Sequence, residues 1–172
     1  MPAFAVALCA YRYDEVAWVF LEVLKRAASG KELDGNEALF FFRGLHIIGY
    51  CRDTQAFKPL LGFLRRPPHE VEALLGDAAT ETLTQIVAGV FDGDADALLG
   101  AAVDTAIEGS VRGALIGAAA FLTWEERIPR RHFVEFLQRF HAERLAPDGD
   151  MAWFAWMSAI GVLGLRDMQP AV

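Results

Sequence analysis

Three aspartates alternate with small residues in the segment Asp92-Gly93-Asp94-Ala95-Asp96. Carboxylates at this spacing could bind Ca²⁺, since an EF-hand loop takes acidic residues at positions 1, 3 and 5, glycine at 6 and glutamate at 12. Counted from Asp92, position 6 is Ala97 and position 12 is Val103, so the frame is broken. We therefore interpret the segment as a corner in which Asp94 caps the next helix, and we expect no metal there.

The remaining side chains with reactive groups form no known catalytic pattern. No histidine has a glutamate three residues before it, and no HExxH sequence occurs. Gly113-Ala114-Leu115-Ile116-Gly117 is typical of close helix packing and not of a phosphate loop. We expect no catalytic residue, no cofactor and no enzymatic activity. The histidines and cysteines to which this applies are His46, His69, His132, His141, Cys9 and Cys51.

Acidic residues dominate the middle of the chain. The net charge is −7, and no lysine or arginine occurs between Arg66 and Arg112. A nucleic-acid-binding protein needs a net basic face, so we expect no nucleic-acid partner. The alternative is a nucleic-acid partner bound through a local stripe of Arg127, Arg130 and Arg131.

Targeting signals and membrane spans are not expected either. The apolar start lacks a basic leader, and the longest uncharged run, residues 151–165, is 15 residues long, short of the ~20 that span a bilayer. The two cysteines lie in apolar surroundings without metal-ligand spacing, which favours a reduced, cytoplasmic protein.

The 172 residues are 54% hydrophobic, and their periodicity predicts helices only. Apolar residues recur at helical spacing in each predicted helix, and glycine, proline or aspartate stands at its ends. We expect helices at about 14–28, 36–50, 54–64, 68–75, 83–91, 95–103, 108–124, 129–140 and 151–164.

The corners between helices recur at a regular interval. Asp53 and Asp167 occupy similar corners 114 residues apart, which is three periods of 38. Helix pairs at periods near 40 are typical of HEAT and armadillo repeats. We predict a single all-α domain over residues 1–172, a HEAT/armadillo-like α-α superhelix of antiparallel helix pairs. The alternative is a bundle without repeats.

Four segments stand out together: Leu74-Leu75-Gly76-Asp77, 90–94, 111–122 and Ile128-Pro129-Arg130. In this combination they resemble an uncharacterised bacterial HEAT-like family, a domain of unknown function. The likeness covers about Tyr13 to Leu165, and it implies a fold but no reaction. Longer members can end in a cysteine-rich SEC-C zinc motif that this chain lacks, so no zinc role carries over. The chain also stops where a further helix would begin, which suggests truncation.

Two features remain as candidate interaction sites in a repeat scaffold. The corner at Asp92, Asp94 and Asp96 could bind a basic protein, or it could only improve solubility. Trp153 and Trp156, with Phe154 and Met157, lie on the last full helix. If no helix covers them, they favour a homodimer or a protein partner, and otherwise they belong to the core. The rival hypothesis is an enzyme or small-ligand binder that uses a groove between helices.

Overall fold

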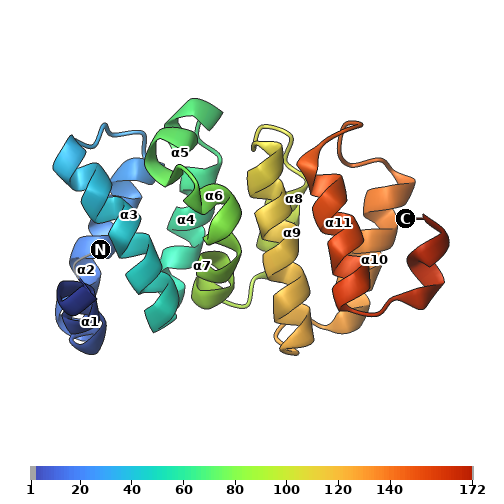
Figure 1. The fold of residues 1–172 in the computed structure, drawn as a ribbon, viewed down its shortest axis with the longest axis horizontal. Helices are drawn as coiled ribbons and strands as arrows, with labels where there is room; N and C mark the ends of the chain where they lie inside the picture. Colours follow the sequence, from blue (N-terminus) through green and yellow to red (C-terminus); the bar gives the residue numbers. More distant parts are fainter. Residues whose placement is uncertain (1–2, 172) are drawn as a thin grey trace. The chain divides into compact units, whose positions relative to one another are not determined.

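The computed structural model describes residues 3–171, and within this range every regular element is helical (Figure 1). The described chain divides into two compact units, residues 3–78 with 85–92 and residues 79–84 with 93–171. The first helices are α1 (Ala3–Tyr11), α2 (Tyr13–Ala28), α3 (Gly35–Cys51), η1 (Thr54–Ala56), α4 (Phe57–Leu64) and α5 (Pro68–Leu75). Then come α6 (Ala78–Glu81), α7 (Leu83–Val90), α8 (Ala95–Ala102), α9 (Gly109–Trp124), α10 (Arg130–Ala142), α11 (Met151–Val162) and η2 (Arg166–Ala171). The prediction of an all-α helical-repeat fold is confirmed.

In the first unit, α2 packs against α3 and α4. Helix α3 begins at a capping box, in which Asp34 accepts hydrogen bonds from the backbone of Asn36 and Glu37, and Glu37 accepts one from the backbone of Asp34. The buried side chains of α3 then contact their neighbours, as when Phe41 meets the edge of Phe63 at 4.9 Å between ring centroids. Capping and burial together explain why this largely apolar stretch is one continuous helix.

In the second unit, α9 is the central helix and packs against α8, α10 and α11. Its small side chains are mostly buried, which allows the neighbouring helices to approach closely. Asp94 caps α8, Glu108 caps α9 and Asp150 caps α11, each by accepting hydrogen bonds from the first backbone amides of its helix. The predicted cap at Asp94 is therefore confirmed.

Several short elements differ from the sequence-based prediction. Helix α1 was not predicted, because its nine residues are nearly all apolar and offer neither a cap nor an amphipathic period. The short helices α6, before α7, and η2, after α11, were not predicted either. No described helix is long and apolar enough to cross a membrane.

Candidate binding groove

The three aspartates of the acidic corner have different surroundings. Asp92 is exposed and is the last residue of the first unit. Asp94, in the second unit, is half-buried and accepts a hydrogen bond from the Ala97 amide at 3.0 Å. Asp96 is exposed and lies 3.1 Å from His132 Nε2. Within residues 3–171 no group of three His, Cys, Asp or Glu side chains is placed to hold a metal ion.

The two tryptophans of α11 pack into the core of the second unit. Trp156 is 1% exposed, and its indole N–H donates to the Leu137 carbonyl of α10 at 2.8 Å. The idea that Trp156 lies open for a partner is therefore wrong, because α10 covers it. Trp153 is half-buried, packs on Phe140 and donates to the Ala146 and Pro147 carbonyls.

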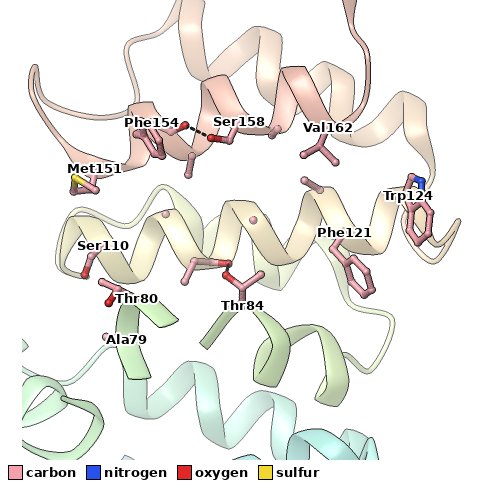
Figure 2. A pocket seen from close by; sticks show the side chains of 16 residues that line it. Ala79, Thr80, Thr84, Ser110, Phe121, Trp124, Met151, Phe154, Ser158 and Val162 are labelled. Atoms are coloured by element: carbon pink, nitrogen blue, oxygen red, sulfur yellow. Dashed lines mark hydrogen bonds between the residues drawn. The ribbon is translucent and has the colours of Figure 1, made fainter. Parts of the chain in front are cut away.

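The opposite face of α11 is open. Met151, Phe154 and Val162 on this face are exposed, and together with α9 and the α6–α7 segment they enclose a groove of about 530 Å³ (Figure 2). All its lining residues belong to the second unit. We call it the α9 groove. It is lined by Ala79, Thr80, Thr84, Ser110, Gly113, Ala114, Gly117, Ala120, Phe121, Trp124, Met151, Phe154, Ala155, Ser158, Ala159 and Val162.

Helix α9 forms the floor of the groove, and α11 and the α6–α7 segment form its sides (Figure 2). The floor residues recur three or four positions apart and so share one face of the helix. The glycines in this row have no side chains that would project into the groove. A Cβ atom at Gly113 would lie 3.5 Å from the Ala155 Cβ, and one at Gly117 would lie 3.3 Å from Thr84 Oγ1.

Large apolar side chains stand at both ends of this floor. Phe154 is 63% exposed beside Met151 at the Ser110 end, and Trp124 is 66% exposed beside Phe121 and Val162 at the other end (Figure 2). From Ser110 to Trp124 the helix rises about 21 Å at 1.5 Å per residue. The groove is therefore long and narrow, with anchoring side chains at its two ends.

The polar side-chain groups of the groove are four hydroxyls and the indole N–H of Trp124, and three of the hydroxyls already bond to the protein. Thr84 Oγ1 donates to the Ala114 carbonyl at 3.3 Å, Ser158 Oγ donates to the Phe154 carbonyl at 2.9 Å, and Ser110 Oγ donates to Glu108. None of the described lining residues is titratable. The surface that remains is suited to binding apolar groups.

A buried ion pair fixes the Ser110 end of the groove. The side chain of Arg112 is 3% exposed and pairs with Asp150, which is 13% exposed. Arg112 Nε also donates to the Ile107 carbonyl at 3.1 Å, and Asp150 caps α11 through the Ala152 amide. The pair therefore connects the start of α9 with the start of α11, the two helices between which the groove is formed.

Part of the α9 groove could be predicted from the sequence. The spacing of Gly113 and Gly117 predicts close helix packing, which the short distances to α11 and to Thr84 confirm. The same glycines also create the groove, together with Phe121 and Trp124 in the same row. That row is visible in the sequence, but the segment at Ala79–Thr84 that completes the groove can be placed only by the tertiary structure.

The fold and the groove define an all-α helical-repeat protein with an open apolar groove. A family model described as "Protein of unknown function (DUF1186)" matches residues 1–172, so the chain belongs to this family. The resemblance to an uncharacterised family is thus confirmed. No curated protein and no solved structure matches the chain closely enough to be called similar.

Proposed function

We propose that the protein is a non-enzymatic interaction module, and that the α9 groove binds the apolar face of a helix from a partner protein. The observation that carries this proposal is the groove itself, an open apolar channel of about 530 Å³ with exposed aromatic residues at both ends. Amphipathic helices commonly bind in such channels through apolar residues at positions i, i+3, i+4 and i+7.

The dimensions of the groove favour a helix as its occupant. A length of about 21 Å corresponds to about 14 helical residues, or nearly four turns. Sites for small ligands usually combine apolar walls with a few polar groups that fix the orientation of the ligand. In the α9 groove Thr84, Ser110 and Ser158 already have protein partners. This supports a ligand recognised by shape and apolar contact.

A peptide selection tests the proposal while the partner is still unidentified. Random 16-residue peptides displayed on phage are selected on the full chain, and the enriched peptides are then measured against variants of the protein. We expect these peptides to carry apolar residues at helical spacing. Phe154→Ser should weaken their binding about 10-fold or more, since removal of one aromatic anchor often costs about 2 kcal/mol.

A matched substitution controls for general loss of apolar surface. Phe4 is 81% exposed on α1 in the first unit, so Phe4→Ser should leave binding unchanged. A second variant, Gly117→Leu, fills the floor and should also abolish binding, whereas Gly100→Leu, at an open position of α8, should not. Peptides without helical spacing, or peptides that bind Phe154→Ser as well as wild type, would overturn the proposal.

We also propose that the protein acts in a reducing compartment, the cytoplasm. Both cysteines are free thiols, and each is partly accessible. Proteins that keep free, partly exposed thiols are typical of compartments in which disulfides do not persist.

A further inference from the structure

Charge is distributed unequally around the α9 groove. The second unit contains 12 acidic and 7 basic residues, and all seven basic residues lie at or after Arg112. The lining segments 79–84 and 110–124 therefore include one basic residue, Arg112, which is buried and paired with Asp150. An exposed positive charge is thus missing from the described floor of the groove.

Acidic side chains instead border the groove at the Ser110 end. Glu81 is exposed between the lining residues Thr80 and Thr84. The carboxylate of Glu108 is bonded to the hydroxyl and the backbone amide of Ser110, and the residue is exposed. Both groups place negative charge beside an apolar surface.

Two basic side chains at the start of α10 are engaged away from the Ser110 end of the groove. Helix α10 lies on the side of α11 that buries Trp156, opposite the face that carries Phe154 and Ser158. On α10, Arg131 pairs with Glu135. Arg130 donates to the Leu163 carbonyl at 2.6 Å, just after the last turn of α11. This basic group is thus engaged at the end of α11 opposite to Glu81 and Glu108.

We infer that the occupant of the α9 groove is a basic amphipathic helix, whose apolar stripe lies on α9 and whose lysine or arginine side chains lie beside Glu81 and Glu108. This inference rests on the proposed function and specifies the chemistry of the partner. Complementary charge at the border of an apolar contact contributes mainly to specificity and to the rate of association, and it is weakened by salt.

Two synthetic 16-residue peptides test the inference on the full chain. They share one apolar stripe of leucines, and the other positions hold lysine in one peptide and glutamate in the other. Binding is followed by calorimetry and by the change in intrinsic tryptophan fluorescence, to which Trp124 in the groove contributes. We expect the lysine peptide to bind at least about 10-fold more tightly in about 50 mM salt, and its advantage to shrink severalfold in about 300 mM salt.

Variants separate a local effect from the net negative charge of the protein. The double variant Glu81→Gln/Glu108→Gln should reduce the advantage of the lysine peptide severalfold, and glutamine at 108 still offers an oxygen to the α9 amides. Glu143→Gln, at the exposed end of α10, changes the net charge without altering the groove and should have no effect of its own.

The outcomes distinguish the basic partner from the helix-binding groove itself. Equal binding of both peptides, with both lost in Phe154→Ser, would overturn the basic partner and leave the helix-binding groove intact. Tight binding of the lysine peptide that survives in Phe154→Ser, or that falls as much in Glu143→Gln as in the double variant, would also overturn the inference. If neither peptide binds, the proposed function fails with it.

Discussion

Arg112 and Asp150 form a buried ion pair at the Ser110 end of the α9 groove. Both are largely shielded from solvent, and they connect the first turns of α9 and α11. A buried charge that loses its partner is far more costly than an exposed one, because the remaining ion cannot regain its hydration. The pair therefore stabilises the Ser110 end of the groove.

Asp150→Asn removes the partner of Arg112 and keeps a side chain able to cap α11. We expect this variant to lower the free energy of unfolding by about 3 kcal/mol or more, the usual cost of an uncompensated buried charge. Urea titration followed by circular dichroism measures it. Asp148→Asn is the control, since Asp148 pairs with Arg144 at the surface and such pairs contribute under about 1 kcal/mol. Equal effects would contradict the account.

Tyr13 gives the first unit a dependence on alkaline pH. Its partial burial, together with the hydrogen bond that it donates to Asp53 at 2.7 Å, raises the pKa of the Tyr13 phenol well above its ordinary value of 10.0. The folded state thus retains a proton that the unfolded state releases. The stabilisation is complete below about pH 10 and is lost as the pH rises above this value.

The Tyr13→Phe variant isolates this contribution to stability. We expect wild-type protein to lose stability between about pH 9 and pH 11 more steeply than the variant, because phenylalanine has no proton to release. Urea titrations at several pH values measure the two slopes. Tyr11→Phe is the control, since Tyr11 is 88% exposed. Parallel slopes for wild type and Tyr13→Phe would contradict the assignment.

At the scale of elements, α3 and α7 meet through glycine. A Cβ atom placed at Gly89 would come within 2.2 Å of the Gly49 carbonyl oxygen, which is backbone and has no side-chain freedom to move aside. The two helices can approach this closely only because neither residue carries a side chain.

Gly89→Ala should therefore destabilise the protein by about 1–3 kcal/mol, the usual range for overpacking. Gly100→Ala, on α8 with no atom near its would-be Cβ, should instead stabilise it by about 0.5–1 kcal/mol through helix propensity. Thermal unfolding of both variants against wild type measures the difference. A Gly89→Ala protein as stable as Gly100→Ala would show that the helices are not in close contact.

Local features of the fold could be predicted from the sequence, whereas its tertiary contacts could not. Helices with a clear cap and an apolar stripe were predictable, as was the cap at Asp94, because the signal lies within a few residues. Helix α1 has neither feature. The burial of Trp156 depends on α10, and the groove depends on three distant segments. Such contacts are not encoded by spacing along the chain.

At the scale of the whole molecule, the two units differ in surface and charge. The second unit holds the α9 groove and most of the excess negative charge. In this unit Asp96 is a candidate for electrostatic steering of a basic partner, since its side chain is 89% exposed. A surface charge of this kind would increase the rate of association more than the affinity.

The central claim is that the α9 groove is the binding surface of the protein. It is tested most directly by titrating the isotope-labelled full chain with the lysine peptide and mapping the shifts of the assigned backbone amides. The account predicts shifts concentrated in residues 79–84, 110–124 and 151–162, and their loss in Phe154→Ser. Shifts concentrated on α1 or along the exposed side of α10, or shifts that persist in Phe154→Ser, would contradict it.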